Sequence, residues 1–445
     1  MTLIMSVSGT RGIVGQTMTP TLAAELGCAF GSHVGHGTIV VGRDSRSSGL
    51  MIQAGLTSGL LATGCHVVDL GVVSTPGVGV MVLEHEAAGG VVITASHNPI
   101  AWNGIKFLTA QGFAPPPELA EQILQRYRDK AFSLVDTEGI GRRQRDDTTH
   151  DRHVRRVLST LDVPAVRRHP YNVVLDSVNG AGGLEAYRLL ERLGCFVHHL
   201  NAEPDGRFTH PPEPTEDNLT SLCDAVLDRH ADIGFAQDPD ADRLAIVDNQ
   251  GRYIGEEFTI ALAAKFMFDR RPGPAAVNLS TSRMIDDLAA QAGGPCVVHR
   301  TPVGEANVVQ AVLAHDCVIG GEGNGGVIDP RIVPVRDRLV AMGLVLSLLA
   351  QELCPLNEIV DRMPRYVMLK RKFELDRPRI DAWLGRVRGI VGDGRLTDSD
   401  GLRIDWPDGW VHLRSSNTEP IARVIAEAPD PATAEALVKR VTDLL

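Results

Sequence analysis

Three stretches of the chain open in the same way, and this repeated opening restricts the fold more than any other feature of the sequence. TIVVGRDSRSSG begins at Thr38, YNVVLDSVNGAGG at Tyr171 and PAAVNLSTSRMID at Pro274. Each opening places a short apolar run before a turn of Gly, Ser or Asp, and a helix-like pattern follows. Such runs are typical of buried strands in a mostly parallel sheet that helices cover. The sequence therefore predicts a tandem of similar α/β domains.

The chain of 445 residues is too long for one hydrophobic core, and length alone predicts about three domains. A polar, weakly periodic stretch at residues 130–153 marks a first boundary, and a second falls near residues 249–255. After about Pro364 the sequence predicts a strand (VMLKRKFEL), a hairpin that turns at Pro407-Asp408-Gly409 and a closing helix (PATAEALVKRVTDLL). We expect α/β domains at residues 1–148, 149–250 and 251–364, and a smaller α+β domain at residues 365–445.

Composition excludes several classes of partner. The formal net charge of −11 argues against nucleic-acid or anionic-membrane binding, so any phosphate site must be local. The seven cysteines are scattered, without a C-x-x-C pair, which indicates buried thiols in a reducing compartment. No apolar run approaches the roughly 18 residues of a membrane span. We expect a cytoplasmic monomer or homodimer.

The segment VVITASHNPIAWNGIKF leads from a predicted strand at residues 91–94 directly into a turn with Ser96 and His97. A serine at such a junction lies exposed at the C-terminal edge of the sheet, where α/β folds carry their chemistry. The alternative is a helix N-cap. The G-x-S-x-G pattern of α/β hydrolases is absent, because Ala95 and His97 flank the serine.

Three aspartates, Asp238, Asp240 and Asp242, alternate in ADIGFAQDPDADRLAIVD between two apolar runs. Carboxylates this close repel one another unless a hard cation or hydrogen-bond donors neutralise them. Oxygen ligands suit Mg²⁺. The alternative is a solvated turn, and an EF-hand is disfavoured because the loop lacks its glycine and its closing glutamate.

Two further segments contain groups that can bind a phosphorylated sugar. VIGGEGNGGVIDP has four close glycines, and its Glu322 and Asn324 can hydrogen-bond vicinal hydroxyls, although glycine-rich turns are common. LRSSNTEPIARVIAEA is either a capped turn or a cradle for a phosphate dianion. Its polar groups belong to Arg414, Ser415, Ser416, Asn417, Thr418 and Arg423.

In chain order, the motifs SGTRG, TASHNP, DPDADR, GEGNGG and RSSNTEP resemble the signature set of the α-D-phosphohexomutase family, and the match runs from Ser8 to Arg423. The family includes phosphoglucomutases, phosphomannomutases and phosphoglucosamine mutases. The resemblance implies three related α/β domains with mixed, mostly parallel sheets and a TBP-like α+β domain, all around a central cleft. It also implies an isomerase that interconverts hexose 6-phosphates and hexose 1-phosphates through a phosphoserine. A sugar 1,6-bisphosphate would be both intermediate and activator.

The resemblance assigns roles by position. Catalytic roles fall to Ser96 as the phosphoserine and to the cations Arg11, Lys106 and Arg243. One Mg²⁺ per chain would be held by Ser96, Asp238, Asp240 and Asp242. Binding of the hexose phosphate would fall to Glu322, Asn324, Arg414, Ser416, Asn417, Thr418 and Arg423.

The sequence departs from the family pattern at two places. Many members end the sugar loop in E-x-S-G-H, whereas Asn324 and Gly326 replace the serine and the histidine here. Some members have V-G-H where this chain has Glu305. A proton-transfer role of those histidines cannot be carried over, which leaves Lys106 or His97 as the candidate base.

The GEGNGG form resembles the phosphoglucosamine mutase subset, and Glu305 would favour a C2 ammonium group if it faced the cleft. A phosphomannomutase or phosphoglucomutase is the alternative. A sugar-phosphate phosphatase would need the same serine and metal but no distal phosphate loop, so RSSNTEP favours the mutase. A non-catalytic binder is disfavoured by the intact Ser96 and the three carboxylates.

Overall fold

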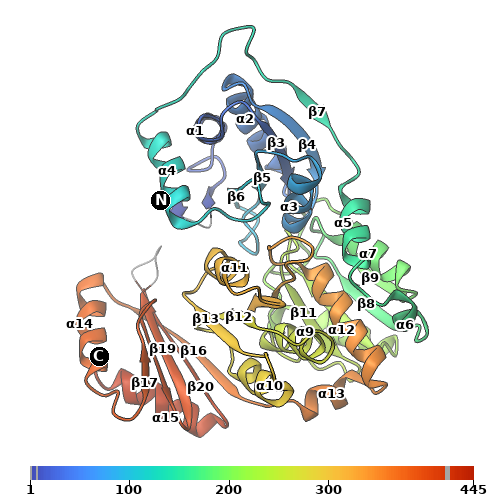
Figure 1. Ribbon diagram of the computed structural model, residues 1–445, viewed down its shortest axis with the longest axis vertical. Helices are drawn as coiled ribbons and strands as arrows, with labels where there is room; N and C mark the ends of the chain where they lie inside the picture. Colours follow the sequence, from blue (N-terminus) through green and yellow to red (C-terminus); the bar gives the residue numbers. More distant parts are fainter. Residues whose placement is uncertain (1–2, 7–8, 416–420) are drawn as a thin grey trace.

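The computed structural model describes residues 3–6, 9–415 and 421–445 of the chain. These residues form four sheets in four consecutive parts of the chain, which we call domains I to IV. In Figure 1 they follow one another around an arc, with domain I at the top, II at the right, III at the lower centre and IV at the lower left. The predicted fold class of three α/β domains and one α+β domain is confirmed. The boundaries drawn from the sequence stay a prediction.

Domain I has a seven-stranded mixed sheet in the order β1-β2-β6-β5-β3-β4-β7. Its strands are β1 (Ile4–Ser6), β2 (Gly9–Ile13), β3 (Thr38–Arg43), β4 (His66–Val72), β5 (Gly89–Ile93), β6 (Trp102–Leu108) and β7 (Arg143–Arg145). Its helices are α1 (Pro20–Val34), α2 (Gly49–Ala62), α3 (Thr75–Glu84) and α4 (Pro117–Arg128). The sequence does not predict β7, whose three residues are all exposed and pair with β4 at the sheet edge.

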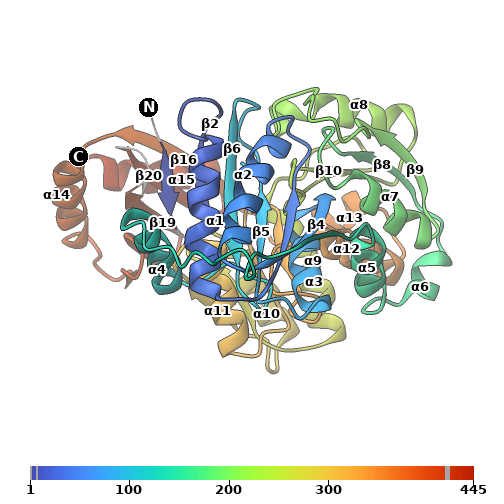
Figure 2. The same cartoon turned by 90° about the horizontal axis from the view of Figure 1, so that it is seen from above.

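Helices α1 and α2 lie side by side on the domain I sheet, as Figure 2 shows. Leu26 of α1 and Leu56 of α2 belong to one buried cluster. A Cβ atom on Gly59 would lie 2.1 Å from the carbonyl oxygen of Ala24, so only glycine permits this close approach of the two helices.

Domains II and III each have a four-stranded sheet covered by helices. The strands of domain II are β8 (Asn172–Asp176), β9 (Phe196–Leu200), β10 (Ile233–Gln237) and β11 (Leu244–Asp248), and its helices are α5 (Thr149–Leu158), α6 (Val163–Arg167), α7 (Gly183–Arg192), η1 (Glu216–Asn218) and α8 (Thr220–Asp228). The strands of domain III are β12 (Ala275–Asn278), β13 (Val298–Thr301), β14 (Ile319–Glu322) and β15 (Gly326–Ile328), and its helices are α9 (Glu257–Arg270), α10 (Met284–Ala292), α11 (Glu305–Ala314), α12 (Arg338–Glu352) and α13 (Leu356–Arg362).

The first three domains share one order of four core strands. The orders are β6-β5-β3-β4, β11-β10-β8-β9 and β15-β14-β12-β13. In chain order, the first three of these strands run parallel in each domain. The fourth forms a hairpin with the third and runs antiparallel to it. The related domains predicted from the three openings are therefore present, and each opening begins with the first core strand.

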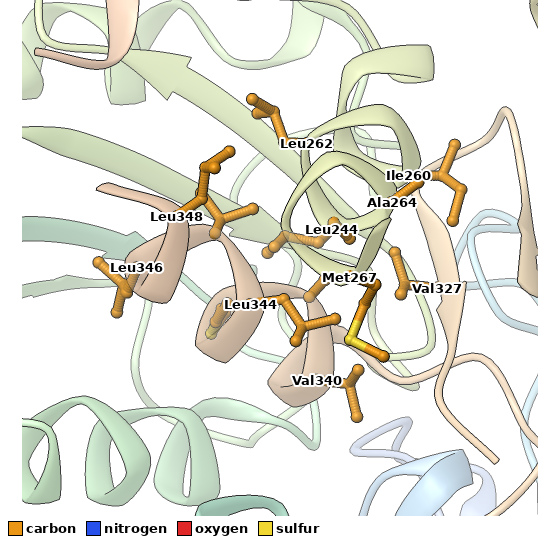
Figure 3. Packing of buried hydrophobic residues seen from close by; sticks show 14 of the residues in the cluster. Leu244, Ile260, Leu262, Ala264, Met267, Val327, Val340, Leu344, Leu346 and Leu348 are labelled. Atoms are coloured by element: carbon orange, nitrogen blue, oxygen red, sulfur yellow. The ribbon is translucent and has the colours of Figure 1, made fainter. Parts of the chain in front are cut away.

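The largest hydrophobic core joins domains II and III. Figure 3 shows Met267 of α9 beside Val340 and Leu344 of α12, and Leu244 of β11 and Val327 of β15 belong to the same cluster. Helix α12 is apolar on nearly all sides because it is buried between the two domains. This shared core fixes the β10–β11 loop relative to the β14–β15 loop.

Domain IV has an antiparallel sheet in the order β16-β20-β19-β18-β17 with two helices. Its strands are β16 (Val367–Glu374), β17 (Arg395–Thr397), β18 (Leu402–Trp406), β19 (Gly409–Ser415) and β20 (Ile421–Ala428), and its helices are α14 (Arg377–Arg388) and α15 (Pro431–Thr442). The predicted strand, hairpin and final helix are thus all present.

Within the described part of the chain, no single helix has the length and apolar character needed to cross a membrane. Helices α12 and α13 meet this test only when taken together, and an 88° bend separates them.

Candidate active site

Ser96 lies in the loop that joins β5 to β6, at the C-terminal end of β5. Its φ of 51° falls in the left-handed region, which is uncommon for a residue other than glycine. The Ser96 hydroxyl donates a hydrogen bond to Oδ2 of Asp238 (3.0 Å), and its backbone N–H donates to Oγ1 of Thr94 (2.8 Å). Ser96 is at the predicted sheet edge, but only 1% of it is exposed. The expected exposure is wrong because the domain II loop with Asp238 packs onto it.

Arg46, in the loop after β3, holds the Ser96 loop in place. Its guanidinium pairs with Asp44 (3.0 Å) and donates to the carbonyl oxygens of Ser96 (2.7 Å) and Asn98 (2.6 Å). It also donates to the carbonyl of Pro99 in the same loop (2.8 Å) and to that of Trp102 at the start of β6 (2.9 Å). Arg46 is buried, and Thr94 donates to the other side of this network at Asp44 (2.7 Å). Arg46 belongs to the first repeated opening, yet the sequence does not predict this role.

The three aspartates Asp238, Asp240 and Asp242 lie in the loop between β10 and β11 and are all fully buried. One carboxylate oxygen of each lies within 4.8 Å of the others. Asp238 accepts the backbone N–H of Asp242 (3.1 Å), and Asp240 accepts the hydroxyl of Thr75 in α3 (2.7 Å). The structure therefore brings Ser96 of domain I and the three carboxylates of domain II together.

The donor set fits Mg²⁺. The Oδ1 atoms of Asp240 and Asp242 are buried, and neither has a hydrogen-bond partner among the described residues. Burial and the charges of the other two aspartates raise the pKa of Asp238 well above its ordinary value. A hard divalent cation that prefers oxygen ligands would both bind the two free oxygens and neutralise the repulsion.

Four cationic side chains surround these carboxylates. Lys106 of β6 lies 2.7 Å from Asp240 and 3.6 Å from Asp242. Arg11 of β2 donates to the Asn98 side chain (3.0 Å), in the Ser96 loop. The other two are Arg243, 3.8 Å from Asp242, and Arg336, 2.6 Å from Asp242.

The two predicted candidate bases differ in protonation. Burial lowers the pKa of His97, and the guanidiniums of Arg243 and Arg11 lower it further, to about 2, so the ring is neutral. Burial also lowers the pKa of Lys106, but the carboxylates of Asp240 and Asp242 outweigh it and raise that pKa above its ordinary value. Lys106 is therefore a cation. His97 has its Nδ1 3.4 Å from the Ser96 hydroxyl, but its lowered pKa makes the neutral ring a weak proton acceptor, so neither candidate is singled out as the base.

The sugar loop predicted from GEGNGG is the β14–β15 connection. Glu322 at its start accepts hydrogen bonds from the side chains of Asn278 (2.8 Å) and Arg336 (2.8 Å). Asn324 folds back, and its Oδ1 accepts the N–H of Gly326 (3.2 Å). The hydroxyl of Thr281 accepts the N–H of Gly323 (3.1 Å), so the loop after β12 supports this turn.

Arg336 connects the sugar loop to the aspartate loop, because one guanidinium contacts both Glu322 and Asp242. Arg336 also contacts Glu305. The Glu305 carboxylate accepts a hydrogen bond from the backbone N–H of Arg336 (2.8 Å) and lies 3.7 Å from the Nε atom of Arg336. The negative charge of Glu305 is thus already paired within the protein. Neither contact is predicted from the sequence, since Arg336 lies outside every motif.

The phosphate loop predicted from RSSNTEP is described only at its two ends. Ser416, Asn417 and Thr418 lie outside the described residues. Arg414 of β19 and Arg423 of β20 are directly opposite each other in the domain IV sheet.

Comparisons with known proteins agree with this arrangement. Models of the four phosphoglucomutase/phosphomannomutase domains match residues 3–133, 151–251, 255–366 and 371–444. A relative from Thermococcus kodakarensis named "Phosphoglucomutase/phosphomannomutase" is 38% identical over 94% of this chain and 93% of its own. A relative from Methanopyrus kandleri named "Probable phosphoglucosamine mutase" is 36% identical over 98% of this chain and 96% of its own. A solved family structure from Burkholderia thailandensis aligns with a TM-score of 0.88 at 28% identity, over 99% of this chain and 96% of its own.

Proposed function

The chain belongs to the phosphoglucomutase/phosphomannomutase family, and we propose that it interconverts glucosamine 6-phosphate and glucosamine 1-phosphate through a phosphorylated Ser96. The reaction class is that of a phosphohexomutase, an isomerase that transfers a phosphoryl group within a sugar phosphate. The observation that carries the proposal is the 3.0 Å hydrogen bond from the Ser96 hydroxyl to one of three buried carboxylates. A phosphoryl carrier needs such a hydroxyl beside a site for a divalent cation.

In the proposed reaction, phosphoserine 96 transfers its phosphoryl group to the free O1 or O6 hydroxyl of the substrate. The bond from phosphorus to Ser96 Oγ breaks as the bond to the sugar oxygen forms. The proton of that sugar hydroxyl passes to Ser96 Oγ through a base in this loop region, for which Lys106 and His97 are the candidates. The bisphosphate turns end for end and returns its other phosphoryl group to Ser96. That group leaves a sugar oxygen, which takes up the proton that the Ser96 hydroxyl gives up, so the phosphorylated enzyme is regenerated.

Lys106 and Arg11 would hold the equatorial oxygens of the group in transfer, because both lie beside the Ser96 and aspartate loops. Asp238, Asp240 and Asp242 would bind one Mg²⁺ ion together with the phosphate on Ser96. When bound, this ion would neutralise part of the negative charge of the phosphate on Ser96.

The two remaining loops would orient the sugar. Glu322 and Asn324 would contact its hydroxyls, and Arg414 and Arg423 would bind the phosphate that is not transferred, with Ser416, Asn417 and Thr418. Because the substrate enters with either C1 or C6 toward Ser96, the sugar loop must accept two poses. A phosphatase would not need the phosphate loop.

The choice of glucosamine rests on the GEGNGG loop and on the name of the M. kandleri relative. Glu305 does not support it, because Arg336 already pairs with its carboxylate. A phosphomannomutase or phosphoglucomutase is the second candidate, and the name of the T. kodakarensis relative favours it.

A panel of four substrates tests the proposal. We would measure kcat/KM for the 6-phosphates of glucosamine, glucose, mannose and galactose, each with a catalytic amount of the matching 1,6-bisphosphate. We expect the highest value for glucosamine 6-phosphate. A preference for mannose or glucose 6-phosphate by about tenfold or more would favour the second candidate and leave the mutase chemistry intact. Absence of turnover with all four sugars would refute the mutase.

A further inference from the structure

The domain IV sheet has one face covered by its own helices and one face turned the other way. Leu413 of β19 and Val424 of β20 belong to the core that α14 and α15 complete with Trp383 and Leu437. Because successive residues of a strand point to opposite faces, Arg414 and Arg423 project from the other face. That face is therefore free of the domain's own helices at these positions.

One end of this second face packs against domain III. His412 of β19 is hydrogen-bonded to Ser280 (2.9 Å), and Glu427 of β20 accepts the backbone N–H of Arg283 (2.9 Å). Lys370 of β16 pairs with Glu256 (2.8 Å), just before α9. The next row on this face lies two residues further along each strand, beyond these contacts.

Three cations occupy that next row. Lys372 of β16 is directly opposite Arg423 of β20, and Arg423 is directly opposite Arg414 of β19. Residues directly opposite on neighbouring strands place their side chains on the same face, and like charges there are destabilising. A bound anion would relieve this repulsion.

The row has few partners of its own. Asp400 lies 3.3 Å from Arg414, and Glu374 follows Lys372 on the same face of β16. The Nε atom of Arg423 is buried and makes no hydrogen bond to a described residue. Lys370 and Arg371 each pair with a glutamate, whereas Lys372 forms no ion pair within the described ranges.

We infer that Lys372 is a third basic ligand of the phosphate that stays on the sugar, beside Arg414 and Arg423. The inference rests on the proposed function, which assigns that phosphate to Arg414 and Arg423. Lys372 extends the pair of arginines by one strand, because it is directly opposite Arg423. Lys372 comes from the edge strand β16, about fifty residues before the loop, and belongs to no motif.

A simpler explanation for Lys372 is that a charged edge strand protects the sheet from pairing with another chain. Arg371 offers a matched control, because it is the preceding residue on the same edge strand and faces the other way, toward Glu435 of α15 (2.7 Å). Protection of the edge does not require a particular face, whereas phosphate binding does.

The test is calorimetric titration of glucose 6-phosphate, without bisphosphate, into wild-type protein and the variants Lys372→Ala, Lys372→Arg and Arg371→Ala. Loss of one charged phosphate contact should raise the Kd about tenfold in Lys372→Ala. The Kd of Lys372→Arg should stay within about threefold of the wild-type value. The Kd of Arg371→Ala should equal the wild-type value. In steady-state assays Lys372→Ala should raise KM by a similar factor and change kcat by less than about threefold.

Each outcome decides the inference. Equal Kd values for wild type and Lys372→Ala, in a protein with mutase activity, would overturn it and leave the proposed function standing. A wild-type protein that binds neither glucose 6-phosphate nor inorganic phosphate would overturn both. Lys372→Glu is a second variant, and it should weaken glucose 6-phosphate binding further than Lys372→Ala does. Its unfolding temperature is compared with that of Arg371→Glu, which places the same charge change on the opposite face of β16.

Discussion

Two kinds of loop recur in domains I to III, and they differ in what they contribute. The hairpin loops after the third core strand (residues 94–101, 238–243 and 323–325) contain Ser96 and the three aspartates of the proposed metal site, and the third follows Glu322 directly. The opening loops after the first core strand (residues 44–48, 177–182 and 279–283) hold these hairpins in place. Arg46 binds the first hairpin, the N–H of Ala181 donates to the carbonyl of Pro239 (2.8 Å) in the second, and Thr281 binds the third. The repeated fold thus separates reactive groups from their supports.

The largest expected effect on activity is that of Ser96→Ala. Removing the phosphoryl carrier should lower kcat by about 10⁴-fold or more, while the unfolding free energy changes little. Ser45→Ala in the neighbouring opening loop is the matched control, because its hydroxyl donates to the carbonyl of Asn179 (2.7 Å). It should cost about 1 kcal/mol of stability and leave kcat nearly unchanged. Comparable kcat values for the two variants would contradict the division of roles.

Metal removal should have the next largest effect. Stripping with EDTA should abolish turnover and Mg²⁺ should restore it, because three buried carboxylates in one hairpin need a cation. Asp240→Asn should weaken Mn²⁺ binding by about tenfold or more, measured by calorimetry. Full activity in excess EDTA after metal stripping would refute the assignment of this hairpin.

A change in the first opening loop should act mainly on stability. Arg46→Ala leaves Asp44 as an unpaired buried charge and frees the carbonyls of the Ser96 hairpin, so we expect a loss of about 3–5 kcal/mol in urea unfolding. Arg128→Ala removes an exposed pair with Glu121 and should leave the free energy of unfolding nearly unchanged. An Arg46→Ala protein with the wild-type free energy of unfolding would show that the Ser96 hairpin does not need Arg46 for its stability.

The smallest effect is expected from Thr281→Val, which keeps the side-chain shape but removes the acceptor of the Gly323 N–H. We expect a loss of about 1–2 kcal/mol and a few-fold increase in KM for hexose phosphates, with kcat little changed. Thr160→Val, where the lost bond goes to the carbonyl of Val157 at the end of α5, is the control with no expected effect on KM. An unchanged KM in Thr281→Val would argue that this opening loop does not support the sugar loop.

The sequence predicts the domain organisation of the chain well. It predicts poorly the contacts by which the opening loops hold the hairpin loops in place. The three openings predict the repeated domains because each contains a complete strand, turn and helix start, and these signals are local. The role of Arg46 is not predicted, because it depends on β3 and β5 being neighbours in the sheet, about fifty residues apart in sequence. The pairing of Glu305 with Arg336 is likewise a contact between α11 and the segment before α12. Sequence periodicity gives no information on such contacts.

The strand order shared by the three domains suggests an origin by duplication within one gene. Each domain has a hairpin at the same position, and the three hairpins differ in sequence while the strand order around them is the same. The copies now resemble members of a small gene family that are encoded in one chain and divide a task among themselves. None of the three could carry out the reaction alone, so selection acts on the set, and the loss of any one hairpin cannot be complemented by the other two.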